Sequence, residues 1–190
     1  MEKYLIAGLG NIGEEYAHTR HNIGFDVLDA LAKKHGINWQ IKRLAQVANL
    51  QLKGRQVCLI KPTTYMNLSG RAFRYWLDQE KTPLANSLTV VDDLALPLEK
   101  VRIRPSGTHA GHNGLKDIQL LMGTDAYPKL RFGIGNQFAK GGQVDFVLGK
   151  WQPKEQPIVL QKIDTCVLAI EDFVLMGLNE TMNKYNKMVF

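Results

Sequence analysis

The sequence predicts a single α/β domain, residues 1–190, built on a mixed, twisted β-sheet of about seven strands with helices on both faces. Short apolar runs alternate with segments of helical periodicity, the order typical of this fold class. A chain of 190 residues lies within the usual size of one domain. Two consecutive β-rich segments joined by Lys53-Gly54 predict a hairpin, so some strands are expected to be antiparallel.

The predicted strands are apolar or β-branched runs that end at glycine, proline or polar residues. The first is apolar and stops at Gly8, the next two flank the hairpin turn, and the fourth ends in Asp92-Asp93. In chain order, the predicted strands are residues 4–7, 44–52, 56–61, 88–91, 101–104, 130–134 and 144–148.

Four or five helices are expected between and after these strands. Phe25, Leu28 and Leu31 mark one face of a helix that runs to about Gly36, and a second helix is expected over residues 69–77. A long helix begins near residue 153 and stops at Gly177. Its apolar stripe recurs at steps of four, three and four, at Ile163, Val167, Ile170 and Val174.

Composition excludes several classes of protein. With 45% hydrophobic and 22% charged residues, the chain is neither disordered nor fibrous. No stretch approaches the roughly 20 apolar residues of a membrane span, and the N-terminus does not have the layout of a secretory signal. Cys58 and Cys166 lie far apart in apolar runs, which disfavours a disulfide framework or a cysteine zinc site. A cytoplasmic location is therefore expected.

The positive charge is concentrated in one part of the chain. The net charge is +6, and residues 100–150 contain eight cations and three anions. Lys100, Arg102 and Arg104 alternate along a predicted strand, so they are expected to share one face as a cationic strip. This distribution favours a polyanionic partner, although a solvated strand face is the alternative interpretation.

A glycine-rich turn follows the first predicted strand. Gly8, Gly10 and Gly13 match the spacing of a dinucleotide-binding loop. That loop needs a helix to begin within the motif, whereas here Glu14-Glu15 and further polar residues come first, and two carboxylates would repel a phosphate. A turn that places Asn11 at the end of the sheet is the preferred interpretation.

Polar side chains that could carry chemistry gather at predicted strand ends and helix starts. They are Asn11, His21-Asn22, Met66-Asn67, Asp92-Asp93 and the loop 107–114. Such loops are where sites are built. A histidine with a carboxylate behind it can take a proton from water, and carboxamides can hydrogen-bond a developing oxyanion, so the set favours ester hydrolysis. The plainer alternatives are helix caps and turn residues. His109 and His112 have a spacing compatible with metal binding, but without a third ligand no metal is expected.

Six blocks, spread in order over about residues 5–150, resemble the bacterial peptidyl-tRNA hydrolase family, whose members release tRNA from prematurely released peptidyl-tRNA. They are residues 8–13 with Glu15-Tyr16, 19–24 (Thr-Arg-His-Asn-Ile-Gly), 61–70 (Lys-Pro-Thr-Thr-Tyr-Met-Asn-Leu-Ser-Gly), 92–97 (Asp-Asp-Leu-Ala-Leu-Pro), 111–117 (Gly-His-Asn-Gly-Leu-Lys-Asp) and 130–135 (Leu-Arg-Phe-Gly-Ile-Gly), followed by Phe-Val-Leu-Gly at 146–149.

The resemblance implies that His21 is the catalytic base, that Asp92 supports its basic form and that Asn11 polarises the substrate. It also implies residues that hold the tRNA 3′ end and the peptide, namely Tyr16, Tyr65, Asn67 and Asn113. By position, Arg104 and Arg131 would grip the tRNA 5′-phosphate. The expected protein is a monomeric hydrolase acting in translation on tRNA, not on DNA or membranes, with no metal or organic cofactor.

The chain departs from the family's usual residues at Ile12, Ala95 and Asn136-Gln137. Ala95 removes a carboxylate near the site, which puts any second acid role there in doubt. Two alternatives remain: an RNA-binding relative of this fold without activity, such as the organellar splicing-factor branch, and a dinucleotide-dependent enzyme. The tRNA and peptide preferences, the role of His109, and whether the tail Met188-Val189-Phe190 packs on the domain stay open.

Overall fold

The computed structural model describes all 190 residues. Seven strands form one sheet: β1 (Lys3–Gly8), β2 (Gln40–Lys42), β3 (Ala45–Leu52), β4 (Arg55–Pro62), β5 (Ser87–Asp93), β6 (Val101–Arg104) and β7 (Lys129–Gly133). The helices are α1 (Ile23–Lys34), α2 (Ser69–Gln79), α3 (Asn113–Met122), α4 (Gln143–Val147), α5 (Gln156–Met176) and α6 (Leu178–Tyr185).

The sheet is mixed, with the strand order β2-β3-β4-β1-β5-β7-β6. The four central strands β4, β1, β5 and β7 are parallel, whereas β2, β3 and β6 run antiparallel to their neighbours. The chain moves from β1 to β4 on one side and then crosses back to β5 on the other. Polar residues that follow β1, β4 and β5 therefore meet at one edge of the sheet, where ligands bind in such folds.

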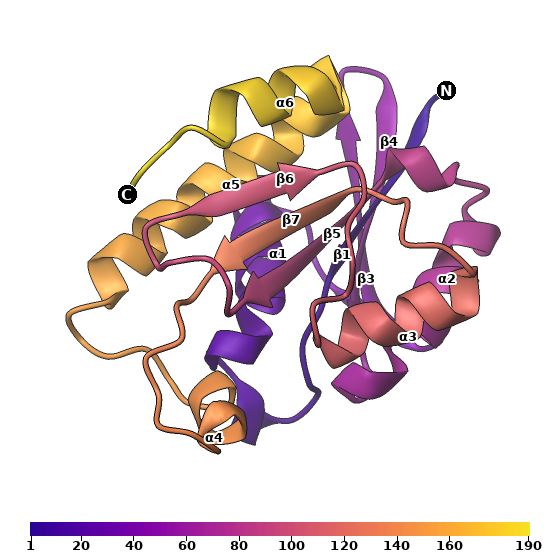
Figure 1. The fold of residues 1–190 in the computed structure, drawn as a ribbon. Helices are drawn as coiled ribbons and strands as arrows, with labels where there is room; N and C mark the ends of the chain where they lie inside the picture. Colours follow the sequence, from indigo (N-terminus) through magenta and orange to yellow (C-terminus); the bar gives the residue numbers. More distant parts are fainter.

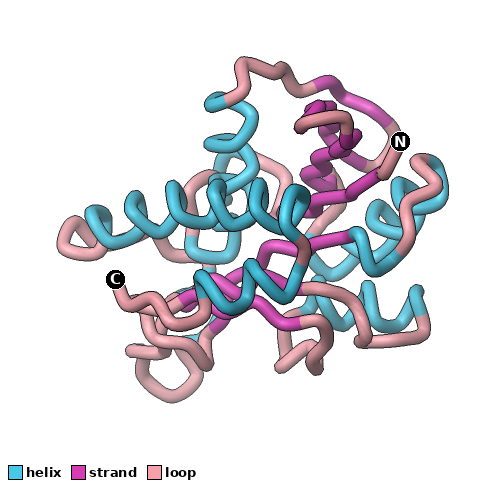
Figure 2. Tube along the Cα trace, turned by 90° about the horizontal axis from the view of Figure 1, so that it is seen from above, coloured by secondary structure: helices cyan, strands magenta, loops and turns pink.

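Helices cover both faces of the sheet (Figures 1 and 2). On one face α1, α5 and α6 enclose a core cluster of 25 buried residues, and on the other α2 and α3 enclose a cluster of 15. Because both faces are covered, the central strands read in the sequence as continuous apolar runs. The predicted fold class is confirmed.

The long helix α5 packs on the sheet through its predicted stripe. Val167, Ile170 and Val174 are buried, and Ile163 is half-buried. Lys162 is also fully buried, and its Nζ donates hydrogen bonds to the carbonyl oxygens of Leu98 and Gly133 (2.7 Å for the latter). Burial lowers the pKa of Lys162 to about 7.

Residues 144–148, predicted as a strand, lie mostly in the short helix α4, so that prediction was wrong. A short apolar run does not distinguish a strand from a helix, and the outer edge of β7 is already occupied by β6. The seventh strand is instead β2, whose residues are all exposed and carried no apolar signal. Helices α3 and α6 were not predicted, although Leu115 and Ile118 begin an apolar stripe that ends at Gly123.

The C-terminal tail packs against the edge strand β6. The backbone amide of Phe190 donates to Glu99 O (2.9 Å), and the side chain of Asn186 exchanges hydrogen bonds with the backbone of Ile103. Lys100 Nζ donates to the carbonyl oxygens of Asn186 and Met188, at 3.0 Å each. The predicted cationic strip thus loses Lys100, because this ammonium group is used to hold the tail.

None of the helices has both the length and the apolar character that crossing a membrane requires.

Candidate active site

A cleft of about 590 Å³ lies at the carboxyl ends of the central parallel strands. One wall comes from the turns that follow β1 and β4 and from the start of α3, and the other comes from α4 and the loop after β5. Seven of the residues predicted from sequence line the cleft: Asn11, His21, Tyr65, Asn67, Asp92, Asn113 and Arg131.

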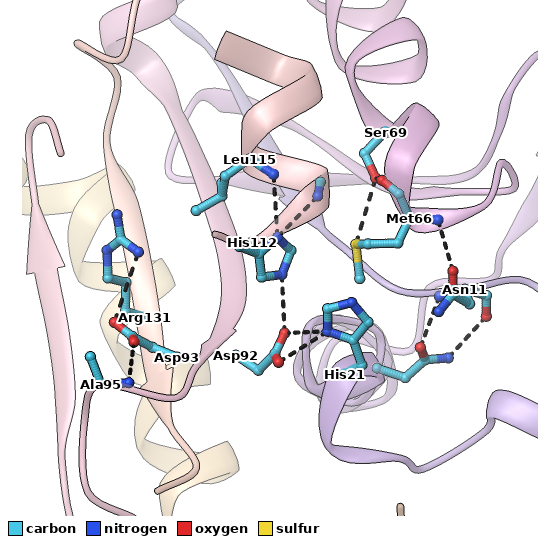
Figure 3. A network of polar contacts seen from close by, with 12 residues as sticks. Asn11, His21, Met66, Ser69, Asp92, Asp93, Ala95, His112, Leu115 and Arg131 are labelled. Atoms are coloured by element: carbon cyan, nitrogen blue, oxygen red, sulfur yellow. Dashed lines mark hydrogen bonds and ion pairs between the residues drawn. The ribbon is translucent and has the colours of Figure 1, made fainter. Parts of the chain in front are cut away.

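His21 is held against the buried carboxylate of Asp92 (Figure 3). It lies in a 3₁₀ turn (Arg20–Asn22) directly before α1, and its side chain is 12% exposed. Its Nδ1 lies 2.9 Å from Asp92 Oδ1 and 3.0 Å from Oδ2. Since the carboxylate only accepts, Nδ1 carries the proton and Nε2 keeps a free lone pair, as a general base requires.

A second histidine, His112, binds the same carboxylate. Its Nδ1 caps α3 by accepting hydrogen bonds from the backbone amides of Gly114 and Leu115, at 3.1 and 3.3 Å. The proton of the neutral imidazole therefore sits on Nε2, which donates to Asp92 Oδ1 at 3.1 Å. Burial alone would raise the pKa of Asp92, but the two histidines outweigh it and hold that pKa well below its usual value.

Sequence reasoning placed His112 in the polar loop 107–114 and in a possible metal-binding pair, and it assigned His112 no role in the reaction. Its position immediately before the apolar stripe of α3 is the signal that could have identified it as a cap. His109, the other half of that pair, lines the cleft and accepts a hydrogen bond from the amide of Gly111 (3.0 Å).

His21, Asp92 and His112 are the one group of side chains whose ligand atoms cluster closely enough to hold a metal ion, within 4.8 Å of one another. For His112 Nε2 to coordinate an ion, its proton would have to move to Nδ1, where two backbone N–H groups already point. The three groups fit one another as a hydrogen-bonded set better than they fit a metal ion.

Neighbouring residues hold Asn11 in an orientation that leaves the NH₂ group of its side chain without a hydrogen-bond partner. Its Oδ1 accepts from the backbone amide of Met66 (2.7 Å), and its own backbone N–H and C=O pair with the side chain of Asn22 at 2.8 and 3.0 Å (Figure 3). The carboxamide NH₂ has no acceptor in the protein, and Asn11 lines the cleft. It can donate to a carbonyl oxygen of a bound substrate.

Close packing of glycines positions this turn. A Cβ on Gly8 would lie 2.3 Å from Gly24 O, and one on Gly24 would lie 2.5 Å from the backbone nitrogen of Leu9. The glycines therefore let the turn after β1 approach the first residues of α1. Because α1 begins only at Ile23, well after Gly13, the turn does not have the geometry of a dinucleotide-binding loop.

The remaining predicted residues divide between the cleft and its surroundings. Tyr65, Asn67 and Asn113 line the cleft and are exposed, so their polar groups can reach a substrate. Tyr16 is half-buried and does not line the cleft. Arg104 is exposed on β6 and also lies outside it.

Arg131 is nearly buried. One guanidinium nitrogen donates to the carbonyl oxygen of Thr108 (2.6 Å) and another lies 3.8 Å from Asp93. Strand register places Arg131 directly opposite Arg102, and Arg104 two residues further along the same face, so the three arginines share one side of the sheet.

The α/β sheet and the cleft at the carboxyl ends of its parallel strands, lined by a histidine–aspartate pair and by amide side chains, define this chain as an α/β enzyme. The family model described as peptidyl-tRNA hydrolase matches residues 5–189, and the chain belongs to this family of hydrolases. The peptidyl-tRNA hydrolase of Phocaeicola vulgatus is 55% identical over 185 residues, covering 97% of this chain and 99% of the relative. The corresponding protein of Syntrophomonas wolfei is 42% identical over 183 residues, covering 96% of this chain and 99% of the relative.

The fold agrees with this family. A solved structure of peptidyl-tRNA hydrolase from Acinetobacter baumannii superimposes with a TM-score of 0.92 at 34% identity, covering 98% of this chain and 95% of the other.

Proposed function

We propose that this hydrolase cleaves the ester between a peptide, or an N-blocked amino acid, and the 3′ ribose of tRNA, with His21 as the base. The observation that carries the proposal is the tautomer of His21: its Nδ1 proton is held by Asp92, so Nε2 is left as an acceptor in the cleft. His112 supports the same state, because it donates to Asp92 and cannot take that proton.

The reaction follows from these groups. His21 Nε2 takes a proton from a water molecule, and the oxygen of that water attacks the ester carbonyl carbon. Negative charge moves to the carbonyl oxygen, which accepts a hydrogen bond from the NH₂ group of Asn11, while Asn67 and Asn113 position the substrate. The C–O bond to the ribose then breaks, and the proton on His21 passes to the ribose oxygen. The products are a peptide carboxylate and a tRNA with a free 3′ hydroxyl.

The carboxylate of Asp92 stabilises the imidazolium form of His21 during this step. This carboxylate is buried and accepts hydrogen bonds only from the side chains of the two histidines. It therefore acts on the base and does not touch the substrate. Asp92 and His112 are therefore positioning residues.

The exposed arginines on one side of the sheet support tRNA as the macromolecular partner. Arg102 and Arg104 are exposed on β6, and Arg131 lies beside them at the rim of the cleft. Guanidinium groups bind phosphates without reading bases. We also propose that the protein acts in the cytoplasm as a monomer, and sedimentation at micromolar concentration tests its oligomeric state.

The decisive experiment is hydrolysis of an N-acetyl-aminoacyl-tRNA by the purified protein, compared with the unblocked aminoacyl-tRNA. Wild type is expected to cleave the blocked ester, and His21→Ala is expected to lose about 10²–10⁴-fold in kcat because the base is removed. His18→Ala is the matched control, since His18 is exposed and pairs with Asp26 outside the cleft. Retention of most activity by His21→Ala would contradict the proposal.

A further inference from the structure

Lys162 of α5 is a fully buried lysine that the reaction described above does not use. Burying an ammonium group is costly unless its donors are satisfied. Its Nζ donates to the carbonyl oxygens of Leu98 and Gly133 (2.7 Å for the latter), and it lies 3.8 Å from the centroid of the Phe132 ring. Two carbonyl oxygens and an aromatic face match the three donors of an ammonium group. The surroundings of Lys162 are therefore built for this side chain.

The two carbonyl groups belong to segments that lead into the active-site cleft. Leu98 lies between β5 and β6, and Gly133 is the last residue of β7. The same two segments place Asp93–Ala95 and Asn136 in the wall of the cleft. Lys162 therefore ties α5 to both segments at once.

Backbone hydrogen bonds join these two segments to each other. The amide of Gly133 donates to Lys100 O at 3.0 Å, and the amide of Ile134 donates to Asp93 O at 3.1 Å. The segments after β5 and β7 thus form one hydrogen-bonded unit, and Lys162 is the side chain through which α5 holds it.

The end of β5 also carries the aspartate that orients the base. In the pairing of β5 with β7, Asp92 lies directly opposite Phe132, the residue before Gly133. Lys162 contacts both of these β7 residues, the ring of the first and the carbonyl oxygen of the second. Because hydrogen-bonded strands shift together, loss of this contact changes the distance between Asp92 Oδ1 and His21 Nδ1, which is 2.9 Å here (Figure 3).

We propose that Lys162 is a positioning residue of the active site, whose ammonium group anchors the ends of β5 and β7 to α5 and so keeps Asp92 at hydrogen-bond distance from His21. The inference rests on the proposed function, in which His21 is the base. Packing alone does not account for a lysine at this position, because a methionine would occupy a similar space without the cost of burying a charge.

The first readout needs no substrate. A histidine N–H that donates to a buried carboxylate gives a proton NMR signal far downfield, and the signal of His21 is identified by its absence from His21→Ala. Lys162→Met keeps the length of the side chain and removes its donors. Measured well below its unfolding temperature, Lys162→Met is expected to lose this signal, because His21 Nδ1–H then exchanges with water.

The second readout is hydrolysis of N-acetyl-aminoacyl-tRNA by the same proteins. Lys162→Met is expected to lower kcat by at least about tenfold, since a misplacement of about 1 Å that originates far from the chemistry can cost about 10²-fold. KM is expected to stay nearly constant, because Asn67 and Asn113, which position the substrate, lie on other elements. A change confined to KM would overturn the inference.

Val174→Ala is the matched control for a loss of stability alone. Val174 is buried on the same helix, about 18 Å further along its axis. Its truncation is expected to lower the midpoint of urea unfolding and to keep both the proton signal and kcat. An equal loss of signal and kcat in Val174→Ala would show that Lys162 acts only through stability.

Lys162→Gln decides the question if Lys162→Met does not fold. Its neutral NH₂ group sits on a side chain one methylene shorter, so it reaches one carbonyl oxygen at most. Loss of one net hydrogen bond is expected to lower kcat by about threefold to tenfold. A folded variant at Lys162 that keeps the proton signal and wild-type kcat overturns the inference. If wild type shows the signal but cleaves no substrate, the proposed function fails, and the signal still decides whether Lys162 holds Asp92 in place.

Discussion

Replacing Asp92 by asparagine keeps the shape of the side chain and removes its charge. Asp92 Oδ1 accepts from His21 Nδ1 at 2.9 Å and from His112 Nε2 at 3.1 Å, and Oδ2 lies 3.0 Å from His21 Nδ1. His112 must keep its proton on Nε2, since backbone amides occupy its Nδ1. The new amide therefore turns its oxygen toward His112 and its NH₂ group toward His21. In that arrangement His21 Nδ1 accepts a hydrogen bond from the NH₂ group, so the proton of His21 lies on Nε2. Nε2 then has no free lone pair with which to act as the base.

The size of the effect follows from the lost charge. Opposite charges about 4 Å apart interact by roughly 4 kcal/mol at an effective dielectric constant of about 20. Loss of that stabilisation of the imidazolium of His21 lowers kcat by about 10³-fold. KM is expected to change little, because Asp92 is buried and its oxygens are occupied by His21 and His112.

The assay is single-turnover hydrolysis of N-acetyl-aminoacyl-tRNA at saturating enzyme. Asp93→Asn is the matched control: Asp93 also lines the cleft, but it binds the amide of Ala95 and lies near Arg131, not near His21. It is expected to lose less than about tenfold in kcat. The reasoning is refuted if Asp92→Asn keeps more than about a tenth of wild-type kcat, or if both variants lose activity equally.

Three other predictions concern the surroundings of the site. Arg20→Met leaves Glu155 without its buried partner and is expected to lower the free energy of unfolding by about 3–5 kcal/mol, measured by urea titration. Arg104→Gln with Arg131→Gln is expected to reduce the slope of log affinity for tRNA against log salt concentration by about 2, measured by filter binding. Burial raises the pKa of Asp26 to about 6, although His18 opposes the shift, so the folded state loses stability as the pH rises from about 4 to about 6. Asp26→Asn is therefore expected to be more stable than wild type by about 2 kcal/mol at pH 7.5 and not at pH 4.

Each of these has a control in the same chain. Lys154→Met removes an exposed cation close to Glu155 and is expected to leave stability unchanged, so an equal loss in both variants would argue against the buried pair. Lys53→Gln with Lys81→Gln removes two exposed charges at the opposite end of the sheet, and tRNA affinity is expected to keep its salt slope. For Asp26→Asn, the same stability difference at pH 4 and pH 7.5 would show that ionisation is not the cause.

The strands and the positions of the polar clusters were predictable because they depend on local patterns. Continuous apolar runs identify strands buried on both faces, and the polar residues that end those strands mark the edge where a site forms. The same reasoning failed for residues 144–148, because pairing depends on whether a sheet edge is free, and β6 occupies the one next to β7. It also missed β2, which is exposed throughout and has no apolar pattern.

The sequence by itself determined the fold class and seven of the residues that line the cleft. It also determined the resemblance to a family of hydrolases, which the comparisons confirmed. The protonation and partners of those residues depended on the tertiary structure. His21 and Asp92 are 71 residues apart, and the tautomer of His112 is set by the first amides of α3. Lys100 appeared free in the sequence but holds the C-terminal tail. Side-chain type is a local property, whereas a hydrogen-bond partner is decided by which distant segments the sheet brings together.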